Sequence, residues 1–222
     1  MAASKKQSNA ADFGLKIVIV GDTGVGKTSL LNRQTESARE PFKTPSSASI
    51  GVSFKVRSYD IDGSVYRVQY WDAPGAERYL RLTSRLCAGA SGAVVVFDVN
   101  SKSSFEHLED WINELDAFTA LPKVLVGNKV DVRPELRQVT ASQAEMFAQK
   151  FSMQYFETSA VNDVEVHEAF SELFALIVEG IPDPPEPSLL LQRGITLTSK
   201  LARDAGLRQA LFLAKNATGG GS

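Results

Sequence analysis

Short apolar runs alternate along this chain with stretches in which apolar residues recur at helical spacing. The runs occupy residues 15–20, 93–97 and 124–126. Their continuous apolar character is typical of strands that are buried on both faces of a parallel sheet. The helical stretches occupy approximately residues 102–117, 140–150 and 163–179. Strands and helices in this alternation predict an α/β domain with a mostly parallel sheet.

The segment between the first two runs has a different pattern. Phe54 and Val56 alternate with polar neighbours, and the same alternation returns over residues 65–71. Asp62 and Gly63 stand between the two segments and favour a tight turn. Two alternating segments around an Asp-Gly pair predict a β-hairpin. We therefore expect one antiparallel strand at the edge of the sheet.

The two ends of the chain differ from its middle. Residues 1–13 are polar, and we expect them to form a flexible tail. Four prolines between residues 182 and 187 end the alternating pattern. We expect one domain over 14–181, then a proline-rich linker and C-terminal tail over 182–222. Three alternatives remain for that tail: a helix that docks on a partner, an amphipathic helix on a membrane surface, or a segment without fixed structure.

Composition narrows the class of protein. The 222 residues are enough for one well-buried core, and the 43% apolar and 23% charged content is ordinary for a soluble globular protein. A net charge of −2 gives no electrostatic reason to expect nucleic-acid binding. The single cysteine, Cys87, cannot form an internal disulfide, which indicates a reducing compartment. We expect a cytoplasmic protein, without a lipid anchor because Ala2 follows Met1 and the C-terminus has no cysteine.

The most informative motif follows the first apolar run, where residues 21–28 (Gly-Asp-Thr-Gly-Val-Gly-Lys-Thr) fit Gly-x-x-x-x-Gly-Lys-Ser/Thr and lead into an expected helix. Such a phosphate loop surrounds a phosphate with backbone N–H groups at a helix N-terminus. Lys27 is expected to reach the β- and γ-phosphates and so to support catalysis, and the Thr28 hydroxyl to ligate Mg²⁺. The alternative is a glycine-rich turn without a ligand. The candidate phosphate-binding residues of this loop are Asp22, Thr23, Gly24, Val25, Gly26, Lys27, Thr28 and Ser29.

A second motif, Asn128-Lys129-Val130-Asp131, follows the apolar run at 124–126 and so lies at the carboxyl end of an expected strand. The Asp131 carboxylate can accept two hydrogen bonds from guanine N1–H and the exocyclic amine, and adenine has neither donor on that edge. Asn128 is expected to contact the base and brace the phosphate loop, and the stem of Lys129 to pack on the ring. The motif therefore favours guanine over adenine, and disfavours an ATPase or kinase.

Two aspartates end apolar strands and are candidates to assist Mg²⁺. Asp72 begins Asp-x-x-Gly, in which the N–H of Gly75 could contact a γ-phosphate. Asp98 has no such glycine, and we interpret it as a strand-end cap or a structural hydrogen-bond partner. Asp72, acting through water, is the better candidate.

These motifs make the chain resemble the small GTPases of the Ras superfamily, most of all the Rab branch, over about residues 14–181. Four segments carry the resemblance in order: 21–28, 72–75, 128–131 and Glu157-Thr158-Ser159-Ala160. Residues 50–54, 77–79 and 92–99 also resemble Rab segments. The resemblance implies the P-loop NTPase fold of a small G domain, with a mostly parallel six-stranded sheet, one antiparallel edge strand and helices on both faces.

The resemblance also assigns further residues. Ser159 and Ala160 would present backbone N–H groups to the guanine carbonyl. Ser49 falls at the switch I threonine, where it would ligate Mg²⁺ and contact the γ-phosphate, and Phe42 would lie against the base. The implied function is a GTP/GDP- and Mg²⁺-dependent switch in vesicle-mediated or other intracellular protein transport. Effectors, exchange proteins and activating proteins would bind the switch regions 44–54 and 71–85.

One departure from the Rab pattern concerns catalysis. Ala76 occupies the position at which Rabs carry the glutamine that orients the attacking water. Alanine has no group for this task, so we expect binding to survive and intrinsic hydrolysis to be slow, unless a partner supplies the missing group. The alternative function is a GTP-bound, largely non-hydrolysing subunit of a larger assembly, such as a transport or ciliary complex. Accordingly, the protein would be free in the cytoplasm, peripheral on an endomembrane, or part of such a complex.

Overall fold

A computed structural model describes residues 11–36, 53–61, 64–75, 86–117, 120–182 and 187–197. Its sheet has the strand order β2-β3-β1-β4-β5-β6, and a short seventh strand pairs with β1. The six main strands are β1 (Phe13–Val20), β2 (Ser53–Ile61), β3 (Ser64–Asp72), β4 (Gly92–Asp98), β5 (Lys123–Asn128) and β6 (Gln154–Thr158). Among these six, the β2–β3 hairpin is antiparallel and every other pair is parallel. The predicted α/β class, with a mostly parallel sheet and an antiparallel edge strand, is confirmed.

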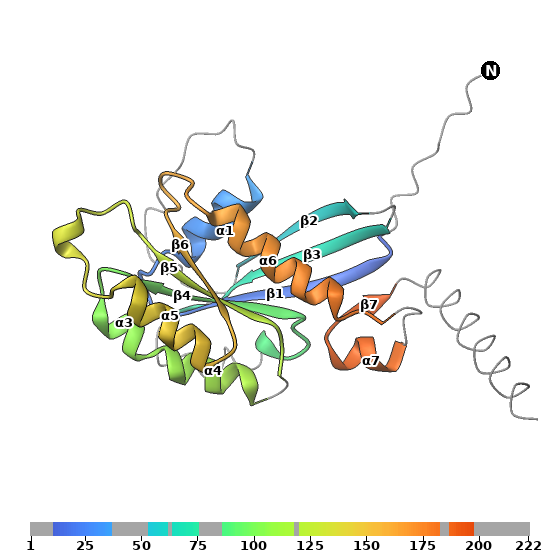
Figure 1. Ribbon diagram of the computed structural model, residues 1–222. Helices are drawn as coiled ribbons and strands as arrows, with labels where there is room; N and C mark the ends of the chain where they lie inside the picture. Colours follow the sequence, from blue (N-terminus) through green and yellow to red (C-terminus); the bar gives the residue numbers. More distant parts are fainter. Residues whose placement is uncertain are drawn as a thin grey trace, which may run out of the picture.

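Helices cover both faces of the sheet (Figure 1). Within the described residues the helices are α1 (Lys27–Thr35), α3 (Lys102–Glu106), α4 (Leu108–Asp116), α5 (Ala141–Lys150), α6 (Val166–Glu179) and α7 (Pro187–Gln192), and a 3₁₀ turn occupies Pro134–Leu136. α1 and α6 bury their apolar side chains against one face of the sheet. α4 and α5 bury theirs against the other, where Trp111 shares a core cluster with Val18 and Phe97. Strands β1, β4 and β5 are therefore buried on both faces over most of their length, which explains the continuous apolar runs in the sequence.

The stretch expected as one helix over 102–117 is two helices. Ser101 caps α3 by accepting a hydrogen bond from the N–H of Ser104, and α3 ends after Glu106. His107 separates the two helices with φ −79° and ψ −2°, and its carbonyl accepts the N–H groups of Asp110 and Trp111 at the start of α4. The apolar period continues across this break, so the sequence pattern alone did not reveal it.

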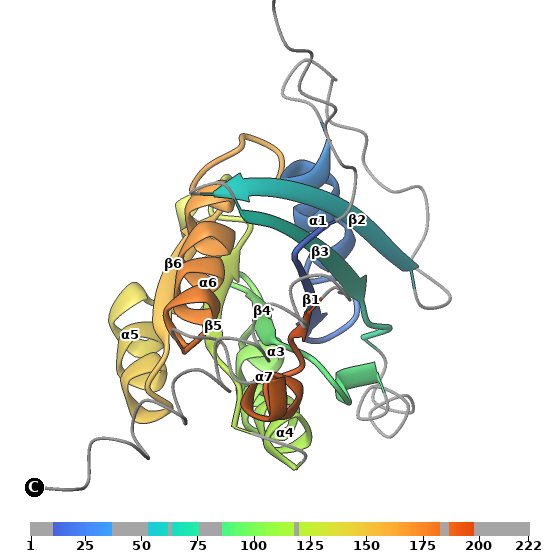
Figure 2. The ribbon, with the colours of Figure 1, turned by 90° about the vertical axis from the view of Figure 1, so that its right-hand side faces the viewer.

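The segment after the proline cluster adds two elements to the domain. α7 and the strand β7 (Thr196–Leu197) lie beside β1, at the end of the molecule that faces the viewer in Figure 2. β7 pairs antiparallel with Phe13 and Gly14, whereas β4 pairs with β1 only from Ile17 onward. Leu190 and Ile195 are buried in the same core cluster as α6. Residues 187–197, which sequence analysis assigned to a linker and tail, thus pack on the sheet.

Gly194 sets the turn between α7 and β7. Its φ of +69° is rarely adopted by residues with a side chain, and a Cβ there would lie 2.5 Å from the carbonyl oxygen of Ala90. The Gly194 carbonyl accepts a hydrogen bond from the hydroxyl of Ser91. Within the described ranges, no helix has the length and apolar character needed to cross a bilayer.

Candidate functional site

The carboxyl ends of the parallel strands bring four of the predicted motifs to one edge of the sheet. Pairing of β1 with β3 places Ile19 opposite Asp72. Pairing of β5 with its two neighbours places Asn128 between Asp98 and Thr158. Loops at this edge of an open α/β sheet form the usual ligand site, so the topology collects segments that are far apart in the sequence.

The phosphate loop depends on its glycines. Gly21, Gly24 and Gly26 have φ values of +137°, +84° and +101°. A Cβ on Gly21 would lie 2.1 Å from the carbonyl oxygen of Val96, and one on Gly26 would lie 2.3 Å from the amide nitrogen of Asn128. Among the described residues, no side chain caps the start of α1. Its first N–H groups therefore suit an anion at the mouth of the loop.

Lys27 lies folded across this loop. Its Nζ donates to the carbonyl oxygens of Gly21 (2.8 Å) and Asp22 (2.7 Å), and the residue is 6% exposed. Burial lowers the Lys27 pKa to about 8, and the negative charges of Asp72 and Asp22 oppose that shift. An anion in the loop would favour the charged ammonium further.

Thr28 and Asp72 form the adjoining part of the site. The Thr28 hydroxyl donates to Oδ2 of Asp72, whose carboxylate is buried. Burial raises the Asp72 pKa, and the Thr28 hydrogen bond and the charge of Lys27 counteract that shift. Gly75 approaches closely, since a Cβ there would lie 2.4 Å from Lys27 Nζ. A hydroxyl and a carboxylate side by side are hard oxygen ligands of the kind Mg²⁺ takes, so these residues fit the ion.

The second motif joins the phosphate loop to β6. Asn128 is 2% exposed; its Nδ2 donates to the Val25 carbonyl over 2.8 Å, and its Oδ1 accepts from the Thr158 hydroxyl over 3.1 Å. The Ser159 hydroxyl donates to Oδ1 of Asp131 over 2.6 Å. Asp131 itself is exposed, so its carboxylate can also meet a ligand. Ala160, the last residue of the segment 157–160, is buried, and its carbonyl accepts a hydrogen bond from the side chain of α1 residue Arg33.

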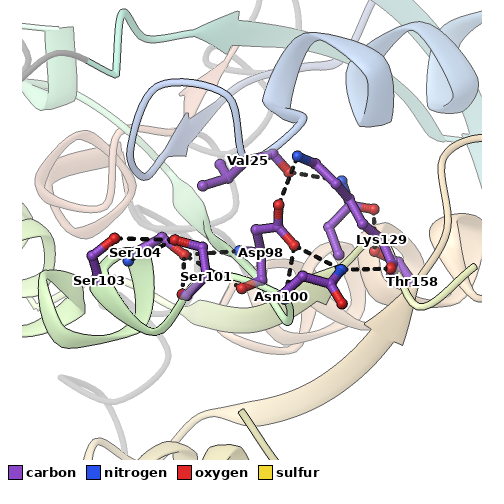
Figure 3. A network of polar contacts seen from close by, with 9 residues as sticks. Val25, Asp98, Asn100, Ser101, Ser103, Ser104, Lys129 and Thr158 are labelled. Atoms are coloured by element: carbon purple, nitrogen blue, oxygen red, sulfur yellow. Dashed lines mark hydrogen bonds and ion pairs between the residues drawn. The ribbon is translucent and has the colours of Figure 1, made fainter. Parts of the chain in front are cut away.

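Lys129 is held by an ion pair. Its Nζ lies 2.7 Å from Oδ2 of Asp98, and the backbone adopts φ +69°. Oδ1 of Asp98 accepts hydrogen bonds from the backbone N–H and the side-chain amide of Asn100, and that amide also donates to the Lys129 carbonyl. Figure 3 shows Asp98 between Asn100 and Lys129. Asp98 is thus a structural partner that orients the Lys129 loop.

Sequence reasoning missed the residues that hold the site from outside. Arg137, in the loop after Asp131, forms a two-pronged ion pair with Glu157. That hydrogen-bonded pair lowers the Glu157 pKa. His107 and Trp111 donate to the side chain of Asp22. No spacing rule links these partners to the motifs, so the sequence carried no signal for them.

Part of the predicted site lies outside the residues that the structure describes. Phe42, Ser49 and Ala76 lie outside the described residues, as does most of the two switch regions 44–54 and 71–85. The remaining phosphate-loop candidates lie where the motif puts them: Thr23 and Gly24 are exposed at the tip of the loop, and Ser29 is half-buried in the first turn of α1.

The fold is that of a small G domain of the P-loop NTPase class. The family model described as "Ras family" matches residues 16–179. The chain is 41% identical to Ras-related protein RIC2 of Oryza sativa subsp. japonica, over 80% of this chain and 81% of the relative. It is 35% identical to Ras-related protein Rab-15 of Mus musculus, over 76% of this chain and 78% of the relative. It is 37% identical to Ras-related protein Rab11E of Lotus japonicus, over 88% of this chain and 92% of the relative. The chain belongs to the Ras family, as a Rab-like small GTPase.

Proposed function

We propose that this protein is a guanine-nucleotide switch of the Rab kind, which binds GTP or GDP together with Mg²⁺ at the carboxyl edge of its sheet. One observation carries the proposal. Lys27, the Thr28–Asp72 pair and the Asn128–Asp131 segment come from three separate parts of the chain and meet at that edge. Family membership supports the guanine nucleotide, and the geometry supports the division of the edge into a phosphate end and a base end.

At the phosphate end, the loop and Lys27 do the binding. The Nζ of Lys27 already points into the loop, where it donates to two carbonyl oxygens. Phosphate oxygens would compete for these donors and, with the N–H groups of α1, neutralise the charge of the nucleotide. Thr28, Ser49 and, through water, Asp72 would hold Mg²⁺, which when bound neutralises charge on the β- and γ-phosphates.

At the base end, Asp131 provides the selectivity. Its exposed carboxylate is oriented by the Ser159 hydroxyl, and Ser159 is itself fully buried. A carboxylate that accepts from two guanine N–H groups is left unpaired by adenine, and an unpaired polar group near a site strongly disfavours the wrong ligand. Phe42, Lys129 and the backbone N–H groups of Ser159 and Ala160 complete the proposed contacts with the base.

Hydrolysis is proposed to be slow. The mechanism of this reaction consists mainly of positioning and electrostatic stabilisation, so loss of the water-orienting group at Ala76 raises the barrier without preventing binding. Such a protein stays in its GTP state for long periods, and effectors would recognise that state through the switch regions in intracellular transport. Ala76 also favours a second candidate, in which the protein is a GTP-bound subunit of a larger transport or ciliary assembly.

The test is nucleotide selectivity of the purified full chain. The nucleotide that co-purifies is released by denaturation and identified, and the affinities for fluorescent GDP and ADP are compared with and without Mg²⁺. We expect a guanine nucleotide and a strong preference for GDP. Asp131→Asn should shift the preference from guanine toward xanthine, because the amide presents a donor where the carboxylate accepts, whereas Glu135→Gln, an exposed neighbour in the same loop, should leave it unchanged. Equal binding of GDP and ADP would refute the proposal.

A further inference from the structure

Asp22 is the only acidic residue in the phosphate loop, 21–28. A negative charge in a loop that surrounds phosphate would repel the ligand unless it were directed elsewhere. Its carboxylate is directed at α4 and the residue before it. Oδ1 accepts from the indole N–H of Trp111 over 2.8 Å, and Oδ2 lies 2.7 Å from Nδ1 of His107. An ionised carboxylate only accepts hydrogen bonds, so the Nδ1 of His107 carries the hydrogen.

The same residue is held from its other side. The backbone carbonyl of Asp22 accepts from Nζ of Lys27 over 2.7 Å. Trp111 is 2% exposed and lies in the same core cluster as Val18 and Val20, near the end of β1. A side chain fixed in this way holds its partner firmly, because a packed core does not deform continuously. Asp22 therefore connects Lys27 to a rigid helix.

We propose that His107 and Trp111 are positioning residues that hold the phosphate loop through Asp22 and so slow the release of the nucleotide. This inference rests on the proposed function. Without their two donors, the Asp22 carboxylate would be able to turn toward the loop N–H groups and toward the ammonium of Lys27, whose charge already interacts with it. Those are the groups that the phosphates need. The two hydrogen bonds thus fix the loop backbone and remove a competitor for the phosphate.

The experiment measures release of fluorescent GDP from the loaded full chain in the presence of excess unlabelled GDP and Mg²⁺. Trp111→Phe keeps the ring and removes the donor, and His107→Ala removes the other donor. Each should speed release about tenfold, as expected for one lost hydrogen bond to a charged group. His107→Asn, which restores an N–H donor, should release within about threefold of the original protein. Asp110→Asn, an exposed position on the same helix, is the matched control and should change nothing.

A double-mutant cycle separates positioning from simple structural damage. In an Asp22→Ala background, Trp111→Phe should add no further acceleration, because its partner is already gone. A purely structural role would accelerate release equally in both backgrounds, and that result would overturn the inference. Single variants that release within twofold of the original protein would overturn it as well. A chain that binds no guanine nucleotide refutes the proposed function and this inference together, whereas unchanged release from a loaded chain refutes this inference alone.

Discussion

The side chain of Asn128 reaches from the end of β5 to the phosphate loop, where its Nδ2 donates to the Val25 carbonyl over 2.8 Å. Its Oδ1 accepts from Thr158 at the end of β6. The amide is almost completely buried and lies so close to Gly26 that no side chain fits between them. One residue therefore joins the base end of the site to the phosphate end.

Replacing Asn128 should destabilise the domain. Asn128→Ala leaves the Val25 carbonyl and the Thr158 hydroxyl without this partner, and an unsatisfied buried polar group costs about 1–3 kcal/mol. We expect a decrease of that size in the free energy of unfolding, measured in urea at a fixed GDP concentration. Thr158→Val removes only one of the two hydrogen bonds and should cost less. An Asn128→Ala protein as stable as the original would show that the bridge contributes nothing.

Lys27 should make nucleotide binding take up a proton. Its pKa in the structure is about 8, and phosphate favours the charged form, so the bound protein holds a proton that the free protein has lost above pH 8. Affinity should fall as the pH rises above about 8. The folding stability of the nucleotide-free protein depends on pH in the opposite direction. The pKa of Lys27 is lower in the folded state than in the unfolded state, so the free energy of unfolding rises with pH between about 8 and 10.5.

The uptake of protons on GDP binding is measured by calorimetry at pH 9. GDP binding is followed in two buffers that differ in their heat of ionisation, and the difference in observed heat gives the number of protons taken up. We expect a value approaching one for the original protein and close to zero for Lys27→Arg, which stays charged throughout. Equal heats in the two buffers for the original protein would contradict the assignment of the shifted pKa to the binding step.

The sequence predicted the fold wherever each element had its own local signal. Continuous apolar runs identified β1, β4 and β5 because both faces of those strands are buried, and the Asp-Gly pair identified the hairpin. α7 and β7 had no such signal. Their stability comes from Leu190 and Ile195, which are buried against distant parts of the chain, and four prolines before them suggested a linker.

The residues of the site also divide into those with a local sequence signal and those without one. The sequence singled out Lys27, Thr28, Asp72 and Asp131 as candidates because their proposed roles depend on spacing within short motifs. Trp111 and its partner Asp22 are 89 residues apart, and only the packing of α4 against the sheet brings them together. Arg137 and Glu157 are likewise joined by tertiary structure. Local motifs therefore predict which groups meet the ligand but not which groups hold them in place.

The alanine at position 76 should make GTP hydrolysis slow. Single-turnover GTP hydrolysis by the full chain should be slower than the rate on the order of 10⁻⁴ s⁻¹ known for unaided Ras-type enzymes. Ala76→Gln should accelerate it about tenfold or more, because the amide can orient the attacking water. Ala76→Leu, which adds bulk without a polar group, should remain slow. Rapid loss of GTP from the original protein would mean that another group replaces the glutamine.

The segment 187–197 should contribute to stability without affecting the site. Ile195 is 1% exposed, and truncation of such a side chain to alanine costs about 2–5 kcal/mol. Ile195→Ala should therefore lower the free energy of unfolding of the GDP-bound protein by an amount in that range. Thr196→Ala, at the exposed neighbouring position, is the matched control and should have little effect.

β7 pairs with the amino end of β1, whereas the phosphate loop follows the carboxyl end, so the rate of GDP release from Ile195→Ala should stay within twofold of the rate of the original protein. Unchanged stability would show that α7 and β7 are not anchored through Ile195, and accelerated release would show that they are coupled to the nucleotide.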